Sequence, residues 1–149
     1  MGYDTFAWNI DINPDVSIPF LLERIDNTLF YYLHQEIKLT FIGTSLGAWY
    51  AAYCSSFFGA NTILINPCYD PNKLLPGIGV SKEVADLYDH AFIELHPNSV
   101  VVIAKDDELL NFTGSSELFK GAKEIIYTET GGHRFNGPEF EEIIRKLIG

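Results

Sequence analysis

The chain has 149 residues, 47% of them hydrophobic and 14% aromatic, and its formal net charge is −10. This length and apolar content suffice for the core of one domain, so we expect a single domain over residues 1–149 and exclude intrinsic disorder. The acidic charge argues against nucleic acid and anionic membranes as partners, because both repel a negatively charged protein.

The sequence also favours a cytoplasmic location. No run approaches the ~18 apolar residues of a membrane-spanning helix, and the N-terminus has neither the basic start nor the apolar core of a signal peptide. In this compartment we expect Cys54 and Cys68 to stay reduced, with Cys54 acting as a small core residue.

The first 42 residues predict a strand, a helix and a second strand. Residues 3–10 form a short β-prone run. Ser17 is a candidate N-cap for a long amphipathic helix, with Pro19 in its first turn. Apolar residues then recur at helical spacing, which predicts one buried stripe: Ile18, Leu21, Leu22, Ile25, Leu29, Tyr32 and Leu33. Residues 37–42 are expected to form the next strand.

This strand runs into the pentapeptide GTSLG at residues 43–47, followed by a helix start near Leu46. A GxSxG turn between a strand and a helix is typical of a nucleophile elbow, in which the central serine, here Ser45, is exposed at the end of the sheet. We expect Gly43 and Gly47 where the backbone passes too close for a Cβ atom. The Leu46 N–H would face an oxyanion above Ser45. The alternative is an ordinary tight strand-to-helix connection.

The remaining chain alternates strands and helices. We expect a nearly all-apolar helix over residues 45–58 ended by Gly59, strands at 62–65, 99–104 and 124–127, and an amphipathic helix from Pro138. Residues 68–97 lack periodicity and are expected to form an irregular lid or substrate loop, with a short helix near 81–87. The fold class predicted is α/β, a mostly parallel sheet with helices on both faces.

Three residues in the order serine, aspartate, histidine each follow a predicted strand: Ser45, Asp106 or Asp107, and His133. The carboxyl ends of parallel strands share one edge of the sheet, where sites form. A neutral imidazole can activate a hydroxyl, and a buried carboxylate can orient the ring. Each residue also has a simpler reading, because the aspartates could be a solvated pair and His133 a loop residue.

The motifs FIGTSLGAWYAAY, ILINPCYDP, VVIAKDDELLNF and ETGGHRF resemble the small single-domain α/β-hydrolases of the YqiA-like esterase family (UPF0227-type). The similarity runs from about residue 37 to the end and is weak across the lid. Carried over by position, it implies Ser45 as nucleophile, Asp107 as acid and His133 as base, with Asp106 as a second choice for the acid.

The chain departs from this family at its N-terminus. The family opens with a strand ending in His-Gly, whose loop supplies a second oxyanion donor, but no histidine here precedes a glycine. Residues 3–35 resemble the family's second strand and first long helix. We therefore expect an N-terminally shortened hydrolase fold, with weak turnover and self-association through an uncovered sheet edge.

The function predicted is a serine esterase or thioesterase acting on small acyl esters, without cofactor or metal. One alternative is a catalytically weak domain of this fold that binds an acyl ligand or a protein, and another is an acyltransferase. The histidines lack metal-ligand spacing. The acidic charge and the aromatic residues Trp49, Tyr50, Tyr53 and Phe135 favour uncharged, apolar acyl groups.

Overall fold

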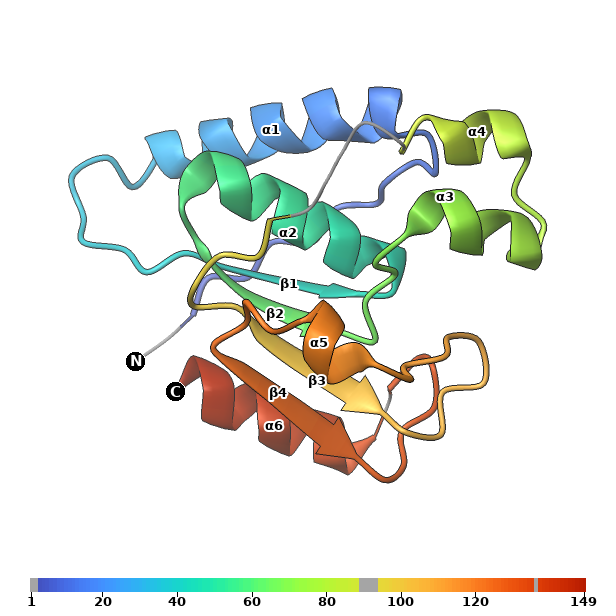
Figure 1. Ribbon diagram of the computed structural model, residues 1–149. Helices are drawn as coiled ribbons and strands as arrows, with labels where there is room; N and C mark the ends of the chain where they lie inside the picture. Colours follow the sequence, from blue (N-terminus) through green and yellow to red (C-terminus); the bar gives the residue numbers. More distant parts are fainter. Residues whose placement is uncertain (1–2, 89–93, 136) are drawn as a thin grey trace. The chain divides into compact units, whose positions relative to one another are not determined.

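The computed structural model describes residues 3–88, 94–135 and 137–149 (Figure 1). The chain divides into two compact units, one built from residues 1–37 and 72–90 and the other from residues 38–71 and 91–149. The second unit contains the sheet and every residue of the predicted site, Ser45, Leu46, Asp107 and His133.

Four parallel strands form the sheet of the second unit in the order β1-β2-β3-β4. They are β1 (Thr40–Thr44), β2 (Asn61–Ile65), β3 (Val100–Ala104) and β4 (Glu124–Thr128). All five residues of β3 are buried, whereas Ile42 in the edge strand β1 is 44% exposed. The continuous apolar run of β3 therefore marks a strand covered on both faces, as its sequence predicts.

Helices pack on both faces of this sheet (Figure 1), which confirms the α/β class. On one face, small residues of α2 (Leu46–Phe58) pack with Leu64, Val101 and Phe119, the last at the end of α5 (Ser115–Leu118). On the other face, α6 (Pro138–Ile148) lays its apolar stripe on β2 and β3. Gly59 ends α2 in the left-handed conformation, as expected.

The long helix of the first unit, α1 (Pro14–Phe30), begins four residues earlier and ends three residues earlier than predicted. Its N-cap is Asn13, whose side chain accepts a hydrogen bond from the Asp15 N–H, while the Ser17 hydroxyl donates to the Asp11 carbonyl from inside the helix. Asn-Pro is a strong start signal, because proline fits the first helical position. Pro19 consequently lies in the second turn, and Leu33 falls beyond the helix, 64% exposed.

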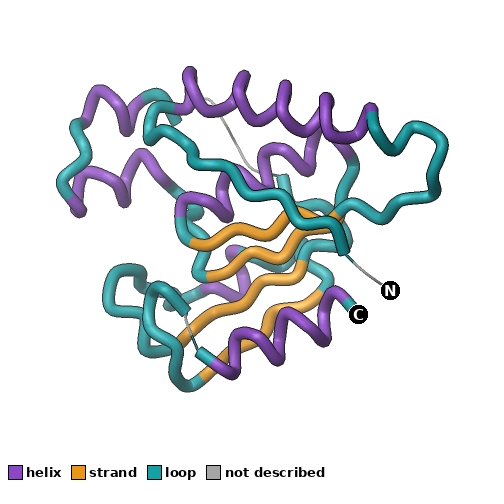
Figure 2. The backbone as a smooth tube through the Cα atoms, turned by 180° about the vertical axis from the view of Figure 1, so that it is seen from behind, coloured by secondary structure: helices purple, strands orange, loops and turns teal. Residues whose placement is uncertain are grey.

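Residues 3–10 contain no strand and run as an extended loop (Figure 2), so their β-prone composition is misleading without a partner strand.

Within 68–97, residues 89–93 lie outside the described residues. The rest holds short helices, α3 (Pro71–Leu74), η1 (Leu75–Ile78) and α4 (Lys82–Asp86), the last confirming the helix expected near 81–87. The role of residues 68–97 as a lid or substrate loop remains a prediction.

Across the three described ranges, no helix is both long enough and apolar enough to cross a membrane.

Candidate active site

Ser45 forms a sharp turn between β1 and α2. Its backbone has φ 55° and ψ −122°, a conformation that is strained for any residue with a Cβ atom. A Cβ added to Gly43 would lie 2.1 Å from the Gly47 carbonyl oxygen, so only glycine fits there. At Gly47 the expectation is wrong, because an added Cβ would meet no heavy atom within 4 Å. The close backbone contact of the elbow therefore requires glycine at position 43 but not at position 47.

A continuous hydrogen-bonded row joins three of the predicted residues. The Ser45 Oγ lies 2.9 Å from His133 Nε2, and His133 Nδ1 lies 2.8 Å from Asp107 Oδ2. The Asp107 side chain is 1% exposed and that of His133 is 11% exposed. Asp107 Oδ1 also accepts the N–H groups of Leu109 and Leu110, which holds the carboxylate in place.

Asp106 and Glu108, on either side of Asp107, bind the backbone of residues 130–135, the histidine loop. Asp106 accepts the N–H groups of Gly131 and Gly132, at 3.3 and 2.8 Å, and Glu108 Oε2 accepts the His133 N–H at 3.0 Å. Asp106 does not contact the His133 ring in the described geometry, whereas Asp107 does. The structure thus gives the two aspartates different partners, which the residue types alone leave open.

One residue at this end of the sheet, Asn66, was not assigned a role from its sequence pattern. Asn66 follows β2 directly, is fully buried, and its carboxamide contacts both the histidine loop and the end of β3. The sequence offered one signal for this residue. Asn66 directly follows a strand, at the same edge of the sheet where Ser45, Asp107 and His133 follow theirs.

The surroundings of Ser45 include an N–H group and a thiol. Leu46 is the first residue of α2, so its N–H has no carbonyl partner within the helix and is available to an anion. Cys68 N–H donates to the Ser45 carbonyl, and burial, followed by the charge of Asp70, raises the pKa of the Cys68 thiol to about 12. A thiol with this pKa is neutral at pH 7 and is a poor nucleophile.

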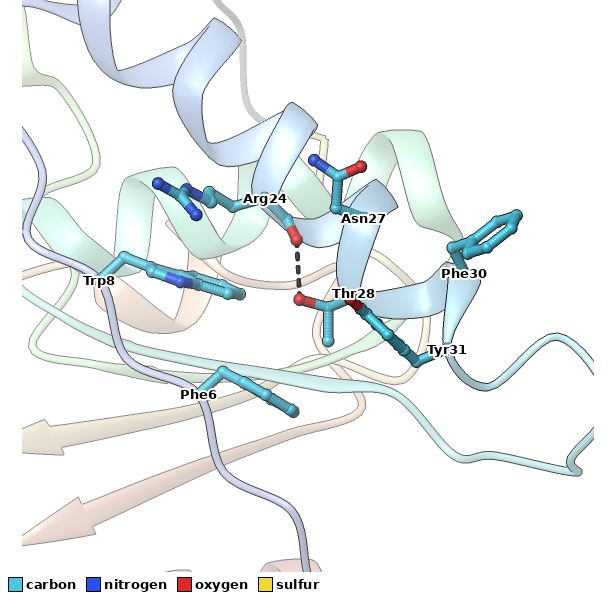
Figure 3. A pocket seen from close by; sticks show the side chains of 7 residues that line it. All are labelled: Phe6, Trp8, Arg24, Asn27, Thr28, Phe30 and Tyr31. Carbon is cyan, nitrogen blue, oxygen red and sulfur yellow. Dashed lines mark hydrogen bonds between the residues drawn. The ribbon is translucent and has the colours of Figure 1, made fainter.

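The aromatic residues named for acyl binding are mostly core residues. Trp49, Tyr50 and Phe135 are 1%, 2% and 3% exposed, so the argument from these three side chains does not hold. An aromatic hollow of about 430 Å³ does exist in the first unit (Figure 3). Its lining comes from the N-terminal loop (Phe6 and Trp8) and from α1 with the turn after it (Arg24, Asn27, Thr28, Phe30 and Tyr31). Its lining includes none of the predicted site residues.

Solved structures with a similar fold are named as hydrolases and lipases. A "Putative hydrolase" from Agrobacterium vitis S4 has a TM-score of 0.64 and 15% identity, covering 91% of this chain and 70% of that one. A monoacylglycerol lipase from Paleococcus ferrophilus has a TM-score of 0.56 and 17% identity, covering 88% and 73%. These similarities show the α/β-hydrolase fold.

A sequence relative is a UPF0227 protein of Shewanella sp. (strain ANA-3). It is 27% identical over 129 residues, which cover 83% of this chain and 71% of the relative. The model of the Uncharacterised protein family (UPF0227) matches residues 10–148. The family resemblance indicated by the sequence motifs is thereby confirmed, and the chain belongs to the Uncharacterised protein family UPF0227.

Proposed function

We propose that this protein is a serine hydrolase that cleaves small carboxylic esters or thioesters through an acyl-enzyme. The proposal rests on the row Ser45 Oγ, His133 Nε2, His133 Nδ1 and Asp107 Oδ2, in which both hydrogen bonds are shorter than 3 Å. With the proton on Nδ1, the imidazole donates to Asp107 and can accept the Ser45 hydroxyl proton through Nε2.

The reaction then has two steps. Ser45 Oγ attacks the carbonyl carbon of the substrate while its proton passes to His133 Nε2, and the Leu46 N–H stabilises the oxyanion. Collapse of the tetrahedral intermediate breaks the bond to the leaving group, which takes the proton from His133 and leaves the acyl group on Ser45. A water molecule, deprotonated by His133, releases the carboxylic acid in the same manner. The buried Asp107 carboxylate stabilises the imidazolium in both steps.

The substrate class follows from charge rather than from aromatic side chains. The net charge of −10 disfavours anionic substrates, which leaves uncharged acyl esters and thioesters as the class to test.

A fluorophosphonate probe tests the proposal, because such probes react with serine hydroxyls that a neighbouring base activates. We expect labelling at Ser45 that Ser45→Ala abolishes. Ser55→Ala is the matched control, because the Ser55 hydroxyl is buried and donates to the Ala60 carbonyl. Equal labelling of the Ser45 variant, or mapping of the label to another serine, would contradict the proposal. Labelling of Ser45 without hydrolysis of p-nitrophenyl acetate would indicate a binding domain or an acyltransferase instead.

A further inference from the structure

Asn66 is held in an unusual backbone conformation. It follows β2 with φ 40°, in the left-handed region that asparagine tolerates better than most residues, and it is 0% exposed. Its N–H donates to the Val102 carbonyl at 2.8 Å, which ties the backbone to β3. The side chain of Asn66 is therefore presented in one fixed direction at the carboxyl edge of the sheet.

The carboxamide of Asn66 joins two separate segments. Its Nδ2 donates to the carbonyl oxygens of Gly132 and His133, at 2.9 and 3.0 Å, and its Oδ1 accepts the Ala104 N–H at 2.8 Å. Both amide protons and the oxygen are thus used, as a buried amide requires.

These contacts connect the backbones that carry the base and the acid. Asn66 binds the carbonyl of His133 itself. Ala104, which it binds on the other side, accepts the Asp107 N–H at 3.2 Å. One rigid amide therefore sets the distance between the backbones from which the imidazole and the carboxylate extend.

We propose that Asn66 is a positioning residue of the hydrolase: its carboxamide holds the His133 loop against the end of β3, so that the imidazole contacts Ser45 and Asp107 together. This inference rests on the proposed function. Asn66 does not touch the reacting atoms and acts through the backbones that carry His133 and Asp107.

Two substitutions separate the side chain's contribution from that of the backbone. Asn66→Asp keeps the shape, the tolerance for positive φ and the acceptor for Ala104, but it sets a carboxylate oxygen against two carbonyl oxygens. Asn66→Gly removes the carboxamide and accepts positive φ without strain. Thr62→Val is the matched control, because the Thr62 hydroxyl is also buried in β2 and donates to Ser99, at the opposite end of the strand from Ser45.

The first measurement is the second-order rate of fluorophosphonate labelling as a function of pH. We expect Asn66→Asp to lower this rate about 100-fold at pH 8, the cost typical of a misplacement near 1 Å. The ratio of the wild-type labelling rate to the Asn66→Asp rate should decrease as the pH falls. The introduced carboxyl group, once protonated, can again donate a hydrogen bond to one of the two carbonyls. The labelling rate of Asn66→Gly should be lower than the wild-type rate at every pH. Thr62→Val should lower the urea midpoint but keep the wild-type rate and pH profile.

The second measurement does not depend on catalysis. In a Ser45→Ala background, the ¹⁵N shifts of the His133 ring, assigned by their loss in His133→Gln, report the tautomer. We expect distinct Nδ1 and Nε2 shifts with Asn66 present, and averaged shifts in Asn66→Asp and Asn66→Gly.

The outcomes distinguish this inference from the proposed function. Wild-type labelling rates and unchanged ring shifts in both folded Asn66 variants, while Ser45→Ala abolishes labelling, would overturn the role of Asn66 and leave the hydrolase intact. If Ser45 is never labelled, the hydrolase fails, and the ring shifts still decide whether Asn66 positions His133.

Discussion

The elbow at residues 43–47 and the histidine loop at residues 130–135 hold their functional side chains by different means. At the elbow, the position of Ser45 is imposed by backbone packing, since a single methyl group on Gly43 would overlap the Gly47 carbonyl. In the histidine loop, position is imposed largely by hydrogen bonds, which Asn66, Asp106 and Glu108 make to the loop backbone. Ser45, the proposed nucleophile, is thus held by steric fit, and His133, the proposed base, is held by polar contacts from other segments.

This difference separates the effects of substitution. A steric constraint fails through loss of folding stability, because overlapping backbone atoms have to move. When a hydrogen bond to the loop is lost, the first effect is a change in the position of the loop, because the loop can shift while the sheet remains folded. Substitution of Gly43 should therefore appear mainly in unfolding experiments, and substitution of the residues that hold the histidine loop should appear mainly in rates.

The largest expected effect concerns Asp107, which contacts the His133 ring from the segment after β3. Asp107→Asn should lower ester turnover about 10,000-fold, because the amide favours the wrong imidazole tautomer. Asp106→Asn is the matched control and should be mild, because its remaining oxygen can still accept the Gly132 N–H. Steady-state kinetics with p-nitrophenyl acetate, together with urea unfolding of both variants, makes the test. A larger loss in Asp106→Asn would transfer the role of the acid to Asp106.

An intermediate effect is expected at the elbow. Gly43→Ala should lower the free energy of unfolding by about 3 kcal/mol, since the methyl group meets backbone rather than a movable side chain. Gly47→Ala adds the same methyl group where no heavy atom lies within 4 Å, and should raise stability by up to about 1 kcal/mol through helix propensity. Urea titration measures both. Similar destabilisation by the two variants would show that steric fit does not distinguish the two glycines.

The smallest effect concerns the thiol beside the elbow. Because the pKa of Cys68 is raised to about 12, the protonated form dominates up to well above pH 8, and the thiolate needed for alkylation is scarce. Iodoacetamide at pH 8 should leave Cys68 unmodified in the native protein and modify it in 8 M urea, as read by mass spectrometry of the peptides. Rapid alkylation of the native protein would show that the elbow region opens and is not rigidly packed.

The elbow and the order of the site residues could be predicted because their requirements are local. The steric constraint of the elbow arises within the five residues GTSLG. Parallel strands place Ser45, Asp107 and His133 at one edge of the sheet, independently of the loops between them. Asn66 could not be assigned a role, because no catalytic motif marks it and its contacts with Gly132, His133 and Ala104 depend on how the loops fold. Residues 3–10 show the converse, since a β-prone run without a partner strand stays a loop. The expected self-association remains a prediction, to be tested by sedimentation.

The parallel topology also sets the order in which reactivity arises during synthesis. Ser45 and its proposed base His133 are 88 residues apart, and His133 follows β4, which is synthesised after β1, β2 and β3. Under the proposed mechanism, a serine hydroxyl without a base is a weak nucleophile. Ser45 therefore lacks its proposed base until β4 has been synthesised and pairs with β3. The proposed acylating activity is delayed until this segment has folded.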